Sequence, residues 1–175
     1  MKIHEYQARK FLIQYGIPTT NAAAFSDAAA AATIFRDLAG KTAIAKVQVL
    51  MGGRGKAGGV LRVASGEEAT SFAKKFLGKP FSTTQSAGES KIVRSILMSE
   101  DKKILEEYYL SVTIDRSRGL PIILFSKQGG MEIEEVAVAN PAAITKIHFS
   151  PEHLPSAESL LPSLRKGFSN DGIPK

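Results

Sequence analysis

A glycine-rich turn between two β-branched runs constrains this chain more than any other stretch. Residues 42–49 and 60–63 have the composition and alternation of strands, and the turn between them is rich in glycine. The stretch therefore predicts a strand–loop–strand hairpin. Alternation places Ile44, Lys46 and Gln48 on one face of the first strand, opposite a more uniformly apolar face.

The composition of this turn suits a phosphate ligand. Glycine lets backbone N–H groups approach an anion closely, and Lys46, Arg54 and Lys56 supply positive charge. Residues 53–58 satisfy the dinucleotide pattern G-x-G-x-x-G, but a strand follows them where that motif needs a helix. The Walker pattern lacks its first glycine and its Ser or Thr. A loop that covers phosphates is one interpretation, and a flexible turn with solvated cations is the alternative.

The composition is ordinary for a globular protein. The 175 residues suffice for one good-sized core or two small lobes. The sequence has no cysteine, and no stretch approaches the roughly 20 apolar residues of a membrane span, so we expect a cytoplasmic protein without a membrane partner. The net charge of +6 is spread along the chain without interleaved aromatics, and a nucleotide explains the local positive charge as well as nucleic acid does.

Helical patterns flank the hairpin. Apolar residues at helical spacing predict a first helix over residues 8–15. Ser26-Asp27 can cap a second helix, with Gly40 as its stop. Ser65, with Glu68 three residues later, forms a capping box for a third helix whose apolar stripe belongs to the core.

The second half of the chain is dominated by strand patterns. Residues 92–98, 104–115 and 121–126 predict three strands of an antiparallel meander. Residues 82–90 are polar and predict a loop, and residues 145–149 predict a last strand.

Four blocks occur in one order: His4-Glu5-Tyr6-Gln7-Ala8, the loop 53–60, Glu107-Tyr108-Tyr109-Leu110 with Asp115-Arg116, and 129–136. Together they resemble the N-terminal part of the β subunits of succinyl-CoA synthetase, an ADP-forming acid–CoA ligase related to malate–CoA ligase and ATP-citrate lyase. The resemblance implies the N-terminal portion of an ATP-grasp fold. That fold is of the α+β (α/β) class, and here it would contain the strand meander and a glycine-rich loop that covers the nucleotide.

The resemblance implies roles for single residues. Lys46 matches the family lysine on the nucleotide phosphates, and Gly53, Arg54 and Gly55 match the loop over the nucleotide. Glu107 matches a contact on the base and ribose side. The implied cofactor is ATP (or GTP), and cations that neutralise developing charge suit phosphoryl transfer.

The chain departs from the family pattern near the expected base site. Ser99 stands where the family carries a glutamate, Glu100 follows one position later, and Lys102 replaces a small or neutral residue. A one-residue slip would restore the carboxylate, and an altered base pocket is the alternative. Thr20 borders the expected base, so the choice between ATP and GTP stays open.

The family also needs parts that this sequence does not match. Phosphate passes from ATP to a histidine on a partner α subunit, then to the acid, and CoA captures the acyl phosphate. The Mg²⁺ ligands are expected beyond residue 175, and His4, His148 and His153 do not match the phosphorylated histidine. We therefore expect no catalytic residue and no metal ligand in this chain. Residues 1–150 would be the N-terminal part of the ATP-grasp domain, and 151–175 a truncated, frayed segment.

The leading hypothesis is the nucleotide-binding portion of a succinate–CoA ligase, as a subunit or fragment that is inactive in isolation. Its partners would be the α subunit, nucleotide, acid and CoA, with no nucleic acid. The alternatives are a non-catalytic ATP-grasp-derived binding module, a malate–CoA ligase subunit and a nucleic-acid binder, whose affinity should depend steeply on salt.

Overall fold

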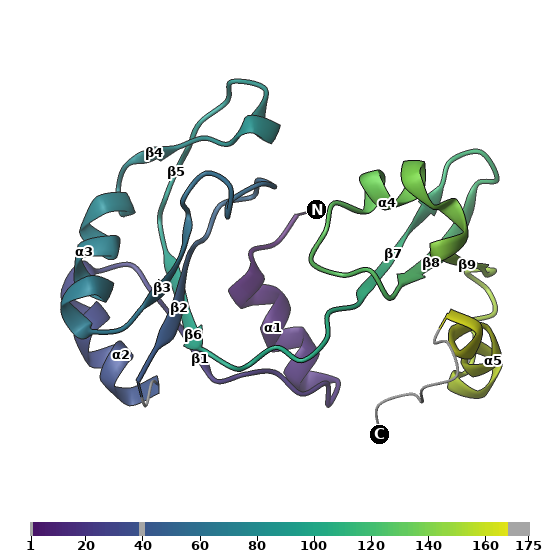
Figure 1. Ribbon diagram of the computed structural model, residues 1–175, viewed down its shortest axis with the longest axis horizontal. Coiled ribbons are helices and arrows are strands. Elements are labelled where there is room, and N and C mark those ends of the chain that lie inside the picture. Colours follow the sequence, from purple (N-terminus) through teal and green to yellow (C-terminus); the bar gives the residue numbers. More distant parts are fainter. Residues whose placement is uncertain (1, 39–40, 168–175) are drawn as a thin grey trace. The chain divides into compact units, whose positions relative to one another are not determined.

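Separate antiparallel sheets organise the two units of the chain, which the computed structural model describes over residues 2–38 and 41–167 (Figure 1). The first unit comprises residues 1–103 and the second residues 104–175. Among the described residues, no helix combines the length and the apolar character needed to cross a membrane.

The first unit is built on a four-stranded sheet with the order β1-β6-β2-β3, in which all neighbours are antiparallel. Strand β2 (Ala43–Val47) pairs with β3 (Val60–Val63) across the glycine-rich turn, so the predicted hairpin is confirmed. The other elements of this unit are α1 (Glu5–Gln14), β1 (Ala22–Phe25), η1 (Ala28–Ala30), α2 (Ala31–Leu38), α3 (Gly66–Phe76), β4 (Pro80–Phe81), η2 (Thr84–Ser86), β5 (Lys91–Ile92) and β6 (Ile96–Glu100).

One face of this sheet forms the core of the unit. Ala43, Ala45 and Val47 of β2 point toward it and are fully buried. Helices α2 and α3 cover this face, and Phe72 packs on Phe76 with ring centroids 4.9 Å apart. Burial of one large apolar side chain contributes about 1.5–3 kcal/mol, so packing on the sheet stabilises these short helices more than their intrinsic propensity does.

The predicted helix caps form, with one difference. Asp27 accepts a backbone N–H two residues later at 2.9 Å, and Ser65 Oγ accepts that of Glu68 at 3.2 Å. The Glu68 carboxylate accepts the N–H of Ala64 at 2.7 Å, although a capping box would have it bind the cap residue Ser65 itself. The predicted stop at Gly40 lies outside the described residues.

The predicted single strand over residues 92–98 is wrong, because the chain forms two strands there. Strand β5 pairs with β4, and the N–H of Val93 donates to the carbonyl of Lys79 at 3.0 Å. The chain then enters β6, between β1 and β2. The predicted loop over residues 82–90 also contains the 3-10 turn η2.

The second unit contains an antiparallel meander, but its strands differ from the predicted set. The order is β7-β8-β9, so residues 92–98 are not part of this sheet, and its third strand is the last predicted strand, which pairs with β8. The strand predicted from residue 104 begins only at Tyr109, because Tyr109 pairs with Ser126, the final residue of β8. The elements are β7 (Tyr109–Asp115), β8 (Leu120–Ser126), α4 (Ile133–Ala139), η3 (Pro141–Ala143), β9 (Thr145–His148) and α5 (Ala157–Gly167).

Asp115 links the end of β7 to the following turn and to β9. Its carboxylate accepts the hydroxyl and the N–H of Ser117 at 2.6 and 3.0 Å, and it lies 2.8 Å from Nε2 of His148. The Ser117 hydrogen bond, followed by that of His148, holds the pKa of Asp115 well below its ordinary value. A carboxyl whose pKa is lower in the folded state stabilises the fold fully above its unfolded pKa. It loses that contribution as the pH falls toward the folded pKa.

We expect Asp115→Asn to destabilise the second unit at neutral pH, and the difference from wild type to shrink as the pH falls below about 4. Urea unfolding at several pH values measures this difference. Glu152→Gln, which alters an exposed acid in the same unit, should unfold like the wild type at each pH. If the difference in free energy of unfolding between Asp115→Asn and wild type stays constant from neutral to acidic pH, the ionised Asp115 carboxylate does not stabilise this unit.

Candidate functional site

Lys46, the main candidate for a phosphate-binding cation, lies on the sheet face of the first unit that points away from the core. The register aligns Lys46 with Leu97 of β6, and Leu97 with Ala24 of β1. Because side chains alternate along a strand, this row lies on the face opposite α2 and α3. The predicted orientation of Lys46 away from the apolar face is therefore confirmed.

Glu5, at the start of α1, joins the two predicted phosphate-binding cations. Its Oε1 accepts a hydrogen bond from Nζ of Lys46 at 3.0 Å, and its Oε2 accepts one from Nη2 of Arg54 at 3.2 Å. Each of the three side chains is only 25–29% exposed. Burial raises the pKa of Glu5, but the charges and hydrogen bonds of Lys46 and Arg54 outweigh it, so the pKa lies below its ordinary value. In the sequence, Glu5 stands out only as part of a family block, so its place in the site could not be predicted.

The glycine-rich loop is closed by its own backbone. Three hydrogen bonds hold it, from Gly59 to Arg54 (2.8 Å), from Ala57 to Gly53 (3.2 Å) and from Gly58 to Gly55 (3.0 Å). Gly53 has a φ of +71°, a conformation that favours glycine. Within the described chain, the N–H groups of Gly53, Arg54 and Gly55 donate to no other residue. These three donors are therefore free to bind an anion.

Other segments pack against this loop. A Cβ built at Gly52 would lie 2.0 Å from Oε1 of Gln85, which belongs to η2. A Cβ at Gly59 would lie 2.6 Å from both the Phe81 ring and the Val47 side chain. Some of these glycines are thus required by packing. The sequence did not predict this, because Phe81 and Gln85 come from a distant segment of the chain.

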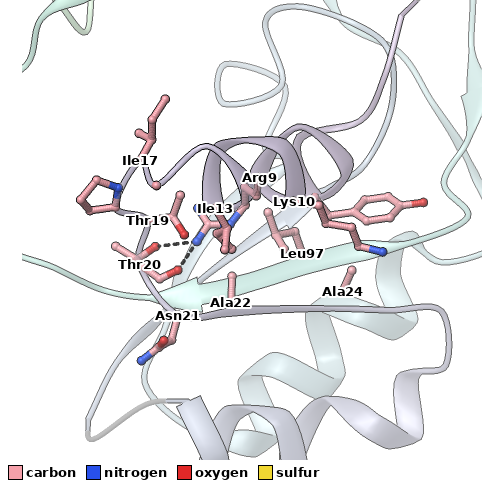
Figure 2. Close-up of a pocket in the computed structure, with 13 residues that line it drawn as sticks. Arg9, Lys10, Ile13, Ile17, Thr19, Thr20, Asn21, Ala22, Ala24 and Leu97 are labelled. Carbon is pink, nitrogen blue, oxygen red and sulfur yellow. Dashed lines mark hydrogen bonds between the residues drawn. The ribbon is translucent and has the colours of Figure 1, made fainter.

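A cavity of about 520 Å³ lies on the same sheet face, between α1 and β1. Ala24 and Leu97, from the row of Lys46, contribute to its lining. Figure 2 shows Arg9 reaching from α1 to Thr20, where it donates to the carbonyl and, at 3.2 Å, to the hydroxyl. Neighbouring strands are about 4.8 Å apart, so two strand spacings separate Ala24 from Lys46 by about 10 Å. The cations and the cavity therefore lie along one elongated region of this face.

The strand register places Ser99 and Glu100 on opposite faces of the sheet. Ser99 pairs with Ile44, two residues from Lys46, and is buried on the Lys46 face. Glu100 follows on the opposite face, where it accepts a hydrogen bond from Asn21 at 2.7 Å and pairs with Lys102 at 2.9 Å. Hydrogen bonds from Lys102 and Asn21 lower the pKa of Glu100. In this register Glu100 lies on the face opposite Lys46.

Glu107 belongs to the second unit, where two glycines lie against it. The N–H of Gly129 donates to the carbonyl of Glu107 at 3.1 Å. A Cβ at Gly129 would lie 2.5 Å from the Glu107 carbonyl carbon, and one at Gly130 would lie 2.4 Å from its Oε2. Two sequence blocks that were identified separately therefore meet in space, and the glycine pair leaves room for the backbone and carboxylate of Glu107.

We expect Gly129→Ala to destabilise the second unit by about 2–3 kcal/mol, because the new methyl group overlaps backbone atoms that cannot move aside freely. Urea unfolding measures this loss. Gly119→Ala is the matched control in the same unit, since its φ of +65° imposes strain but no atom lies within 4 Å of the added Cβ. The control should lose only about 1 kcal/mol. Equal losses in the two variants would contradict the packing of Gly129 on Glu107.

In the described part of the chain, no three His, Asp or Glu side chains are grouped so that they could hold a metal ion. The arrangement of Lys46, Arg54 and the free N–H groups fits an anion with several oxygen acceptors.

The chain matches the ATP-grasp domain family over residues 2–162. Among its curated relatives are proteins named succinate–CoA ligase [ADP-forming] subunit β. That of Exiguobacterium sibiricum is 42% identical over 146 residues, and that of Laribacter hongkongensis is 43% identical over 152 residues. These alignments cover 83% and 86% of this chain but 38% and 39% of the relatives. The chain thus spans about two fifths of the length of the relatives it matches.

Solved structures share the fold at low sequence identity. The dinucleotide-forming acetyl-coenzyme A synthetase 1 of Ca. Korarchaeum cryptofilum, in complex with coenzyme A, Ca-AMPCP and HgCl+, aligns with a TM-score of 0.67 and 18% identity, covering 94% of this chain and 66% of that one. ATP citrate lyase from Methanothrix soehngenii, in complex with citrate and coenzyme A, aligns with a TM-score of 0.63 and 21% identity, covering 97% and 44%. These matches confirm the predicted fold.

Proposed function

Because the chain belongs to the ATP-grasp family, we propose that it supplies the phosphate-binding part of the nucleotide site in an ADP-forming acid–CoA ligase β subunit. The curated relatives favour succinate as the acid. The proposed partners are ATP, succinate, CoA and an α subunit that carries the phosphorylated histidine. We place residues 1–150 within the ATP-grasp domain and the protein in the cytoplasm.

The observation that carries this proposal is the convergence of two cations on one anion. Lys46 and Arg54 both donate to the carboxylate of Glu5, beside a loop in which the N–H groups of Gly53, Arg54 and Gly55 donate to no other described residue. Ammonium, guanidinium and backbone donors around one point are the groups that bind polyphosphates. Their role in the reaction is to position the phosphates and to offset the negative charge that develops during transfer.

The cavity beside α1 is the proposed site of the nucleoside. Its volume of about 520 Å³ is in the range of small-molecule sites, and it lies along the row of Lys46. Thr20, held by Arg9, borders it and is a candidate for base selection. Ser99 lies on the same face as Lys46 and is a further candidate. Glu107 is proposed to contact the base and ribose side of the nucleotide. Mg²⁺, when bound, would screen phosphate charge, and we place its ligands outside the described residues.

Calorimetric titration of the full chain with ATP, GTP, AMP and duplex DNA tests this function. We expect ATP to bind at one site and AMP to bind more weakly, because AMP lacks the phosphates that would reach Lys46 and Arg54. A preference between ATP and GTP would indicate how the Thr20 region selects the base. No heat with either triphosphate would contradict the proposal, and tight DNA binding that weakens steeply with salt would favour the nucleic-acid alternative.

A further inference from the structure

We propose that Glu5 is a positioning residue that holds Lys46 and Arg54 together as one phosphate-binding unit. The inference rests on the proposed function and adds a residue to its site. Glu5 contributes one carboxylate oxygen to each cation, so the two side chains are fixed at opposite ends of one planar group.

The hydrogen bonds to Glu5 leave donors on both cations. A lysine ammonium has three donors and an arginine guanidinium has five. In the described structure Lys46 uses one, for Glu5, and Arg54 uses two, one for Glu5 and one for the carbonyl of Val47 at 3.0 Å. A phosphate can therefore bind both cations while the carboxylate stays in place.

Glu5 is itself held against the strand that carries Lys46. The N–H of the next residue, Tyr6, donates to Oε1 of Gln48 at 3.2 Å, and Gln48 is only 2% exposed. Gln48 lies two residues after Lys46, so the start of α1 is bonded to the same segment as the cation. Arg54, by contrast, is on the glycine-rich loop, and its bond to Glu5 connects that loop to α1.

A positioning role and simple electrostatics predict opposite changes in phosphate affinity when this carboxylate is removed. Glu5→Gln removes a negative charge beside the phosphates, which by charge alone would tighten the binding of an anion. A glutamine, however, offers one acceptor oxygen and would turn its NH₂ group toward the second cation. If Glu5 holds the cations in place, binding must weaken although the site becomes more positive.

The test titrates ATP, inorganic tripolyphosphate and AMP into the 175-residue wild-type chain, Glu5→Gln, Glu5→Asp and Asp101→Asn. Asp101 is the matched control, because it also accepts from an arginine and a neighbouring side chain, Arg62 and Thr42, in the same unit. We expect Glu5→Gln to weaken ATP and tripolyphosphate about tenfold, a free-energy change of about 1.4 kcal/mol. AMP binding should change less, and Asp101→Asn should bind like the wild type.

Glu5→Asp keeps the charge but is one methylene shorter, so it should also weaken ATP and tripolyphosphate if it cannot reach both cations. Thermal unfolding of each variant shows whether it folds. If Glu5→Gln does not fold, the binding data for Glu5→Asp test the role of Glu5. If the wild type binds ATP and tripolyphosphate and the Glu5 variants bind them equally well or more tightly, the inference is overturned. The proposed function would then remain intact. Equal weakening for AMP and tripolyphosphate would also overturn it. A wild type that binds neither ATP nor tripolyphosphate would overturn both proposals.

Discussion

Lys46→Ala is expected to weaken ATP binding about 100-fold, or about 2.7 kcal/mol. The substitution removes the ammonium group that bonds Glu5. The strand register places this group on the same sheet face as the cavity between α1 and β1. A hydrogen bond to a charged group contributes about 1.5–3 kcal/mol, which accounts for most of this loss. Glu5 adds to it, because its carboxylate would then be neutralised by Arg54 alone. Calorimetric titration with ATP measures the change.

The control for this experiment is Lys74→Ala. Lys74 is an exposed lysine in the last turn of α3, and α3 covers the opposite face of the sheet. It changes the net charge by the same amount as Lys46→Ala, so any long-range effect of charge appears in both variants. We expect Lys74→Ala to bind ATP like the wild type. If Lys46→Ala lowers the affinity for ATP by less than threefold, Lys46 does not belong to the proposed site.

Gly59→Ala is expected to destabilise the first unit by about 3 kcal/mol, the upper end of the usual cost of overpacking. The added methyl group would lie 2.6 Å from the ring of Phe81 and from the side chain of Val47, both of which are in the buried core. It would also lie 3.1 Å from the carbonyl of Arg54, which accepts the hydrogen bond that closes the loop. Relief of these overlaps requires the loop, the core or both to move.

Gly55→Ala, in the same loop, is the matched control. No atom lies within 4 Å of a Cβ built there, and Gly55 does not have a positive φ. We expect urea unfolding to show a change below about 0.5 kcal/mol for Gly55→Ala. If both variants unfolded alike, Gly59 would be required only for the flexibility of the loop and not for close packing.

The local elements of the first unit were largely predictable from the sequence. The hairpin follows from two alternating runs and the glycines between them, and β2 and β3 form it. Ser65 caps α3 as predicted, and Asp27 caps the 3-10 turn η1, which leads directly into α2. These features depend on a few neighbouring residues, so the information needed to predict them is present in a short window of sequence.

The strand pairing was less predictable. Residues 92–98 look like one apolar strand, but residues 91–93 pair with the segment that follows α3, and only residues 96–100 enter the main sheet. The pattern of α4 was missed, because its acids follow a glycine pair and carry no clear apolar stripe. In both cases the outcome depends on partners that local patterns do not specify.

The candidate site shows the same division. By itself the sequence determined that Lys46 lies on the polar side of its strand and that a glycine-rich loop follows it. Only the tertiary structure showed that Glu5, 41 residues before Lys46, bonds both cations, and that Gly129 packs on Glu107. Alternation and turn chemistry are set by adjacent residues, whereas contacts between distant segments form only when the whole sheet and its helices pack together.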